Sequence, residues 1–293
     1  MDGQRSAAAV KEQHWPGFSK LEALGNDFVL IDARERPFTA GVDQLRRLAD
    51  RRLGVGCDQI LVLESSVESG ALCRVRIHNA DGSAAEQCGN GMRAVALWLH
   101  QRNEMDEQAV LLTGAGKVHV RMEQNGLITA SLGRPDFSPA AWGKPAPADH
   151  WEEVIDGQRV LVRGVSLGNP HLVLDLEEAA DETQVLRMGE FFRDHPRLPR
   201  GANINLAWRD GRDRVVLRVH ERGVGPTMAC GSGACATAVV LLRAGLVDSP
   251  AAIRQPGGEL VIHWSDPSGP VQMTGPARHV FDGNLKPEEP DRP

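Results

Sequence analysis

The sequence predicts a mixed α/β fold that is duplicated within the chain, and three observations support this prediction. Short apolar runs bounded by Gly, Pro, Asn and Asp outnumber the segments with helical character. Two turns of the form Cys-Gly-x-Gly each precede an apolar helical stretch. Landmarks in the first half of the chain recur in the same order in the second half.

The eight clearest apolar runs are predicted to form β-strands, at 28–33, 59–64, 74–80, 117–122, 159–167, 171–176, 214–220 and 259–264. Helices are predicted at 92–101 and 234–245. Both are apolar on nearly every side, apart from Arg93, which is typical of a helix enclosed by a sheet. Segment 134–153 is rich in Pro and Ala and has no clear periodicity, so it is the best candidate for a connection between two domains.

The repeat consists of three landmarks in register, at 24–28 and 167–171, at 77–79 and 219–221, and at 88–91 and 230–233. Cys88 follows Asn26 by 62 residues, and Cys230 follows Asn169 by 61. In both halves the middle landmark ends nine residues before the cysteine. We therefore expect two similar domains whose Cys-Gly-x-Gly turns are related by a pseudo-twofold axis and meet where the halves join.

Composition and charge narrow the class of function. The 293 residues are 41% hydrophobic and 25% charged, which is ordinary for a globular protein. A net charge of -6 argues against a broad basic surface, so no nucleic-acid partner is expected. No apolar run reaches the roughly 18 residues that span a bilayer. Residues 1–16 lack an apolar signal core, so we expect a cytoplasmic protein without a membrane partner.

Cysteine usage indicates free thiols and no metal. The five cysteines are odd in number and irregular in spacing, which does not favour a disulfide framework. No pair has the usual spacing of zinc ligands, so no metal is expected. Cys57, Cys73 and Cys235 stand in or beside apolar runs and are interpreted as small buried hydrophobic residues. Nucleotide-binding and pyridoxal phosphate motifs are absent, so no cofactor is expected.

Cys88 and Cys230 are the candidates for chemistry, because each is predicted at the N-terminus of a helix. Unpaired backbone N–H groups and the positive end of the helix dipole favour a thiolate there, so we expect a lowered thiol pKa. The flanking glycines let backbone amides approach a carboxylate. A single cysteine can act as a nucleophile beside a histidine base, but the duplication predicts two equivalent thiols. Two thiols on opposite sides of one carbon suit removal and return of a proton, which is racemisation or epimerisation.

A family resemblance follows from motifs that occur in order over about residues 17–285. They are FSK (18–20), LGNDF (24–28), GVGCDQ (54–59), NADGS (79–83), QCGNG (87–91), GNPH (168–171), AN (202–203), ERG (221–223), ACGSGA (229–234) and TGPARHVFDG (274–283). In order and spacing they resemble bacterial diaminopimelate epimerase. The resemblance implies two pseudo-symmetric domains, each a curled mixed or antiparallel sheet wrapped around a central helix, with the active site in the cleft between the domains.

The resemblance also implies the reaction and its residues. LL- and meso-2,6-diaminopimelate would be interconverted without a cofactor, in the biosynthesis of lysine and of peptidoglycan precursors. Cys230 would take the proton from the LL substrate and Cys88 would donate one on the other face, while His171 and Glu221 tune the thiols. The substrate-binding residues that it implies are Asn26, Gln59, Asn79, Gly89, Asn90, Asn169, Asn203, Glu221, Arg222, Gly231 and Ser232.

Domain bounds and a homodimer follow from the same resemblance. The N-terminal epimerase domain would comprise 17–132 with 275–287, and the C-terminal epimerase domain 133–274. Composition predicts the two flexible ends, since residues 1–16 are small or polar and the tail is charged and rich in Pro. We therefore expect a flexible extension, 1–16, and a flexible tail, 288–293, to flank the domains. One departure concerns the dimer, since Phe281 stands where some relatives have Tyr near the dimer contact.

Two other functions compete with this interpretation. A proline racemase or hydroxyproline epimerase uses a similar pair of thiols on a ring substrate with one carboxylate. Glu221 and Arg222 argue against it, because a proline ring has no distal ammonium and carboxylate for these charges to engage. A non-catalytic binding protein of the same fold is disfavoured by the presence of both Cys88 and Cys230.

Overall fold

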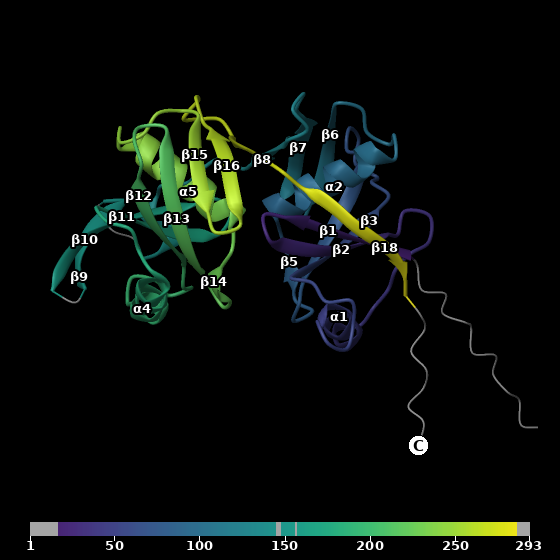
Figure 1. The fold of residues 1–293 in the computed structure, drawn as a ribbon, viewed down its shortest axis with the longest axis horizontal. Coiled ribbons are helices and arrows are strands. Elements are labelled where there is room, and N and C mark those ends of the chain that lie inside the picture. The colour runs from purple at the N-terminus through teal and green to yellow at the C-terminus, as the bar shows by residue number, and fades with distance from the viewer. Residues whose placement is uncertain (1–16, 145–147, 156, 286–293) are drawn as a thin grey trace, which may run out of the picture.

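The computed structural model describes residues 17–144, 148–155 and 157–285. Its strands form one continuous sheet that is divided into two halves lying side by side (Figure 1). The segments expected to be flexible, 1–16 and 288–293, lie outside the described residues.

The first half is built from the N-terminal strands and one strand from the end of the chain. Its elements are β1 (Gly17–Ala23), β2 (Asn26–Asp32), α1 (Val42–Ala49), β3 (Gln59–Glu64), β4 (Cys73–Asn79), β5 (Ala84–Ala85), α2 (Gly89–Gln101), β6 (Gln108–Thr113), β7 (Gly116–Met122), β8 (Ile128–Leu132) and β18 (Arg278–Asn284). β2 pairs parallel with β3, β3 antiparallel with β4, and β4 parallel with β6. β1 lies between β2 and β18, antiparallel to both.

The second half repeats this pattern. Its elements are α3 (Pro139–Trp142), β9 (His150–Ile155), β10 (Gln158–Ser166), β11 (Pro170–Leu176), α4 (Glu182–Arg193), β12 (Asn203–Arg209), β13 (Arg214–Glu221), β14 (Gly225–Thr227), α5 (Gly231–Arg243), β15 (Ala251–Gln255), β16 (Gly258–His263) and β17 (Val271–Gly275). β11 pairs parallel with β12, β12 antiparallel with β13, and β13 parallel with β15. The predicted mixed α/β class and its duplication are confirmed, and β17 joins the halves by pairing with β8.

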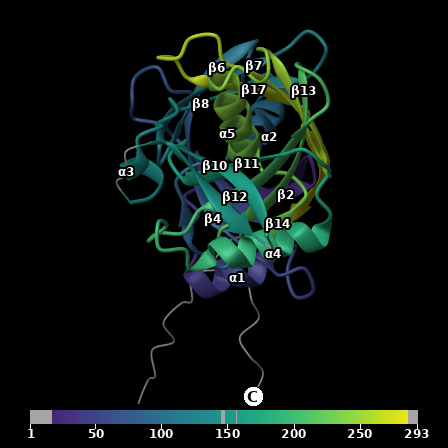
Figure 2. The ribbon, with the colours of Figure 1, turned by 90° about the vertical axis from the view of Figure 1, so that its left-hand side faces the viewer.

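Each half is organised around one buried helix, α2 or α5. Both helices were predicted from their apolar composition, and their side chains pack into the two largest hydrophobic clusters. Burying each large aliphatic or aromatic side chain contributes about 1.5–3 kcal/mol, which is why a helix with no polar face is stable only when it is enclosed. Figures 1 and 2 both show α1 and α4 at the same end of the molecule, as expected for two similar halves.

Segment 134–153 is not merely an irregular connection. It contains α3 and the first residues of β9. Trp142, which is 1% exposed, stacks on Trp151 with 5.4 Å between the ring centroids. The stacked pair anchors Trp142 in the core of the second half, a contact that the Pro and Ala content of the segment did not indicate.

Candidate active site

Cys88 and Cys230 cap the two central helices. Each has an extended backbone, and each Sγ accepts a hydrogen bond of 3.3 Å from the amide three residues later, at Gly91 or Gly233. The first amides of a helix have no intrahelical partner, and here sulfur satisfies one of them. The predicted position of both cysteines at helix N-termini is confirmed.

The two helix N-termini lie against one another. A Cβ atom on Gly231 would lie 3.0 Å from the Oδ1 of Asn90, and one on Gly89 would lie 2.5 Å from the Cε of Met273. Glycine at 231 therefore permits the close approach of the two turns, and glycine at 89 leaves room for the Met273 side chain. Cys88 also acts electrostatically on Cys230, so the structure brings one thiol from each half within electrostatic reach of the other.

Burial dominates the acidity of both thiols. It raises the pKa of the Cys88 thiol to about 11, although the Gly91 amide acts in the opposite direction. Burial and the neighbouring Glu221 carboxylate raise the pKa of Cys230 well above its ordinary value. The expected lowering is wrong for this structure, because the loss of water around a thiolate outweighs the stabilisation by a few amides. Both thiols therefore carry their protons at neutral pH.

Glu221 and Ser232 are the immediate polar neighbours of Cys230. The Ser232 Oγ lies 3.5 Å from the Cys230 Sγ. Glu221 stands at the end of β13, where its Oε1 accepts a hydrogen bond of 2.7 Å from the Thr227 hydroxyl, and the Cys230 side chain is a further hydrogen-bond partner. Burial raises the pKa of the Glu221 carboxyl, and these bonds offset only part of that effect. A carboxyl with a raised pKa can exchange a proton with the adjoining thiol.

Asn26 reaches Cys88 from the start of β2. The Cys88 S–H donates to the Asn26 Oδ1 at 3.8 Å, and the Asn26 Nδ2 donates to the Asp58 Oδ2 at 3.0 Å. Asn26 therefore connects the thiol to a carboxylate in the loop before β3.

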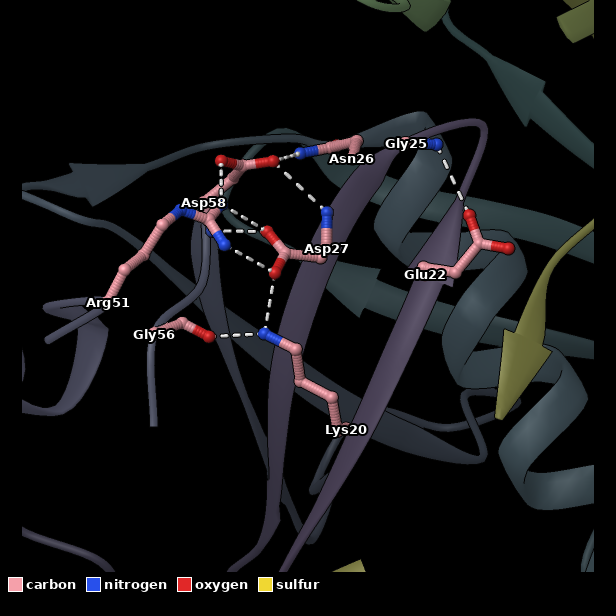
Figure 3. A network of polar contacts seen from close by, with 8 residues as sticks. All are labelled: Lys20, Glu22, Gly25, Asn26, Asp27, Arg51, Gly56 and Asp58. Atoms are coloured by element: carbon pink, nitrogen blue, oxygen red, sulfur yellow. Dashed lines mark hydrogen bonds and ion pairs between the residues drawn. The ribbon is translucent and has the colours of Figure 1, made fainter. Parts of the chain in front are cut away.

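Asp58 belongs to a network of four charged residues, which Figure 3 shows. The Arg51 Nη2 donates to Asp58 and to Asp27, at 2.7 Å in each case. On its other side Asp27 accepts from the Lys20 ammonium at 2.6 Å. Burial alone would raise the pKa of Asp27, but the bonds from Arg51 and Lys20 hold it well below its ordinary value.

Gln59 and Asn79 lie opposite each other on β3 and β4. The Gln59 Nε2 donates to the Asn79 Oδ1 at 2.9 Å, and the Asn79 Nδ2 donates to the Ser83 hydroxyl at 3.0 Å. The Gln59 Oε1 is buried and has no partner among the described residues. This oxygen is therefore available to accept a hydrogen bond from a bound ligand.

Both polar groups of the Asn203 side chain make hydrogen bonds within the chain. Its Nδ2 donates to the Pro170 carbonyl at 3.3 Å, and its Oδ1 accepts from the Arg222 amide at 2.9 Å. It therefore holds the turn that carries Arg222. That guanidinium donates from Nη1 to the Arg200 carbonyl at 2.8 Å and is otherwise exposed.

His171 is wholly buried between two asparagines. Its Nε2 lies 3.1 Å from the Asn169 Oδ1, and its Nδ1 lies 3.2 Å from the Asn205 Nδ2. Burial lowers the pKa of His171 to about 3, so the imidazole is neutral at pH 7.

The residues around this site that the sequence did not single out are Asp58, Asp27, Arg51 and Asn205. Asp58 lies within the motif at 54–59, next to Gln59, and that adjacency is the only signal that could have indicated it. The network around Asp58 depends on contacts between β1, β2 and the loop after α1, which no local pattern describes.

The other three cysteines are buried and free, as predicted. Burial raises the pKa of Cys57 to about 12, of Cys73 to about 11 and of Cys235 to about 12. Among the described residues, no group of three or more His, Cys, Asp or Glu side chains could hold a metal ion. No helix in the described part of the chain is long and apolar enough to cross a membrane.

Comparisons with known proteins agree with this architecture. The family model for diaminopimelate epimerase matches residues 18–138 and 164–280. A diaminopimelate epimerase of Thioalkalivibrio sulfidiphilus is 41% identical over 275 residues, covering 92% of this chain and 98% of that protein. One of Nitrosospira multiformis is 42% identical over 272 residues, with the same coverage. The crystal structure of a hydroxyproline epimerase from Agrobacterium vitis has a TM-score of 0.69 at 15% identity, covering 95% of this chain and 94% of that one, which shows a shared fold.

Proposed function

We propose, for a chain that belongs to the diaminopimelate epimerase family, that Cys88 and Cys230 are the two groups that transfer the proton. The protein is an isomerase that converts LL-2,6-diaminopimelate to the meso form in lysine biosynthesis. The equivalence of the two thiols carries the proposal, since each caps a buried helix and Cys88 acts electrostatically on Cys230 across the halves. One thiol removes the α-proton, and the other returns a proton to the opposite face.

The reacting carboxylate binds, in this proposal, between the two helix N-termini. The first amides of α2 and α5, at Gly89, Asn90, Gly231 and Ser232, lack intrahelical acceptors and carry the positive ends of the two dipoles. A carboxylate placed there is stabilised further as the α-carbon becomes a carbanion and charge spreads onto its oxygens. This supplies stabilisation that a cofactor-free reaction requires.

Proton transfer begins at Cys230 for the LL substrate. Both thiols are protonated in this structure, so a base must first form. Glu221, a hydrogen-bond partner of Cys230 with a raised pKa, accepts the thiol proton. The resulting thiolate takes the α-proton, and Cys88 donates its own proton to the other face of the carbon. In the reverse direction the two thiols exchange roles. His171 supports the site as a neutral group.

The distal ammonium and carboxylate of the substrate engage the remaining polar side chains. Arg222 has exposed guanidinium N–H groups for the carboxylate. The unpartnered Oε1 of Gln59 can accept from an ammonium. Asn26, Asn79, Asn169 and Asn203 complete the proposed set, and Asn203 acts by holding the Arg222 turn rather than by direct contact.

The proposed domain bounds are 17–132 with 275–287 and 133–274. The hydrophobic cluster around α2 lies within the first domain, and the cluster around α5 lies in the second apart from Leu24 and Leu132. Residues 286 and 287 lie outside the described residues. A cytoplasmic location is proposed because the five cysteines are free thiols, as is usual in a reducing compartment.

A homodimer is proposed through β18, which pairs with β1 on one side and with no described strand on the other. Val280 and Phe281 on this strand are 55% and 47% exposed. Unpaired strand edges and exposed apolar side chains favour association. Sedimentation of the wild-type chain should show a dimer, and Phe281→Glu should shift it toward the monomer.

Exchange of the α-proton with solvent tests the function. Incubation with LL-diaminopimelate in D₂O should place deuterium at one α-carbon and yield the meso product. L-proline under the same conditions should remain unlabelled. Deuterium entering proline alone would contradict the assignment.

A further inference from the structure

The two halves hold equivalent asparagines in different ways. Their parallel strand pairs have the same register, since Phe28 faces Gln59 across β2 and β3, and His171 faces Asn203 across β11 and β12. This register makes four pairs of positions equivalent. They are Asn26 and Asn169, Phe28 and His171, Asp58 and Ala202, and Gln59 and Asn203. The first half thus has an acid where the second has Ala, and the second has His where the first has Phe.

In the first half, Asp58 determines which way the Asn26 amide faces. Its Oδ2 accepts from the Asn26 Nδ2 at 3.0 Å and from the Asp27 amide at 3.1 Å (Figure 3). A carboxylate can only accept hydrogen bonds, so the NH₂ group of Asn26 must point toward it. The carbonyl oxygen of Asn26 is left facing Cys88, 3.8 Å from the sulfur.

Arg51 orients the Asp58 carboxylate. Its guanidinium donates to the Asp58 Oδ1 at 2.7 Å, which leaves Oδ2 for Asn26. The same group is held against Asp27 by two further bonds, of 2.7 and 2.9 Å. Because Arg51 is itself held by Asp27, it restrains the Asp58 carboxylate more firmly than a guanidinium without a second partner would.

In the second half, His171 gives Asn169 the opposite orientation. The Asn205 Nδ2 donates to the Leu172 carbonyl at 2.8 Å, so it is a donor to the His171 Nδ1 as well. The proton of the neutral imidazole therefore lies on Nε2, which donates to the Asn169 Oδ1 at 3.1 Å. The Asn169 oxygen is therefore bonded to His171, while its NH₂ group donates no hydrogen bond among the described residues.

We propose that Asp58 and His171 are positioning residues that give two equivalent asparagines opposite polarity, so that Asn26 presents an acceptor and Asn169 a donor to the substrate. The inference rests on the proposed function. Asn26, beside Cys88, receives an N–H of the substrate ammonium, and Asn169 donates to a carboxylate oxygen. The two halves of a duplicated site thereby become able to bind unlike groups, which identical halves could not distinguish.

Asp58→Asn tests the first half of this proposal. An Asn at 58 can offer its own NH₂ group to Asn26, which lets the Asn26 amide turn its oxygen away from the substrate. KM for LL-diaminopimelate should rise about tenfold or more, with a smaller effect on kcat, because a buried polar contact is lost. Asp50→Asn is the matched control, since Asp50 lies just after α1, accepts from the Arg52 and Leu53 amides, and should leave KM unchanged.

A swap variant separates polarity from simple structural support. Asn26→Asp combined with Asp58→Asn reverses the wild-type bond, with the donor now at 58 and the acceptor at 26, and still directs an acceptor toward Cys88. KM should return most of the way to the wild-type value, although the ion pair of Arg51 with residue 58 is gone. An unchanged KM in a folded Asp58→Asn protein, or a swap no better than the single variant, would overturn the proposal.

Asn169→Asp tests the second half of the proposal independently of the Asp58 network. One carboxylate oxygen keeps the bond to the His171 Nε2, so the fold should be retained by circular dichroism. The other oxygen replaces a donor with an acceptor, and KM should again rise about tenfold or more. A normal KM would contradict the assigned polarity. Wild-type turnover in the same assay distinguishes these outcomes from a failure of the proposed function itself.

Discussion

The Arg93 guanidinium is wholly buried and donates a hydrogen bond of 3.0 Å to the Oδ1 of Asn90, beside the contact between the two central helices. Its Nε donates weakly to the Pro276 carbonyl at 3.4 Å, and its Nη1 has no partner among the described residues. Burial lowers the pKa of Arg93 to about 10, so the group remains charged at neutral pH. The charge of this buried cation favours a thiolate formed at Cys88 in the proposed reaction, since each group acts electrostatically on the other.

Arg93→Met should therefore reduce epimerisation. The substitution removes both the support of Asn90 and a positive charge that favours the Cys88 thiolate. We expect kcat/KM to fall about tenfold or more, and Arg93→Lys, which keeps the charge, to lose less. Arg102→Met, at the exposed end of α2, is the control and should behave like the wild type. Equal activity of Arg93→Met and Arg102→Met would refute the role of the buried charge.

Cys88→Ala and Cys230→Ala should each abolish complete epimerisation, because a proton must be handled on both faces of the carbon. The loss should be on the order of a thousandfold or more, as for removal of a general acid or base. Cys235→Ala serves as the control, since this thiol lies in α5, is fully buried and is not part of the proposed site. Near-normal turnover in either single variant of Cys88 or Cys230 would rule out the two-base scheme.

Alkylation of the thiols should show their raised pKa directly. Iodoacetamide reacts with the thiolate, so the rate at Cys88 should rise with pH through a midpoint near 11. The Cys230→Ala variant isolates this reaction and removes one neighbouring thiol. Peptide mapping assigns the modified residue. A midpoint below the ordinary value for cysteine would show that the helix N-terminus outweighs burial after all.

His171 should make the fold sensitive to acid. Its pKa is about 3 in the folded chain and near 6.5 when unfolded, so below pH 6.5 the unfolded chain binds the extra proton. The contribution of His171 to the free energy of unfolding is therefore fully present above pH 6.5. It decreases as the pH falls toward 3, by at most about 1.4 kcal/mol per pH unit. His171→Gln should flatten this slope in urea unfolding between pH 4 and 6. His78 and His220, whose pKa values burial also lowers, and carboxyls such as Asp27, whose pKa is lowered by hydrogen bonds from Arg51 and Lys20, contribute slope that remains. An identical slope in the variant would contradict the neutral, buried state of His171.

Local patterns predicted strands that are apolar or that alternate polar and apolar residues, together with the two central helices. All eight predicted strands are present, as β2, β3, β4, β7, β10, β11, β13 and β16, and both predicted helices form. The pattern did not indicate β1 or β18, whose sequences mix polar and apolar residues. These strands pair across some 260 residues, with Ser19 opposite Asp282, and that pairing is a property of the assembled sheet. The helices α1 and α4 lie at the surface with mixed composition, and they too gave no clear signal.

The sequence by itself determined the duplication, the two helix-capping cysteines and the family, because spacing, turn glycines and apolar runs are written in the order of residues along the chain. Only the tertiary structure decided how acidic the thiols are and which way Asn26 and Asn169 present their amides. Those properties depend on how much water burial removes from Cys88 and Cys230, and on partners such as Asp58 and Asn205 that folding brings together. Solvation and hydrogen-bond direction are consequences of three-dimensional packing, so no linear pattern specifies them.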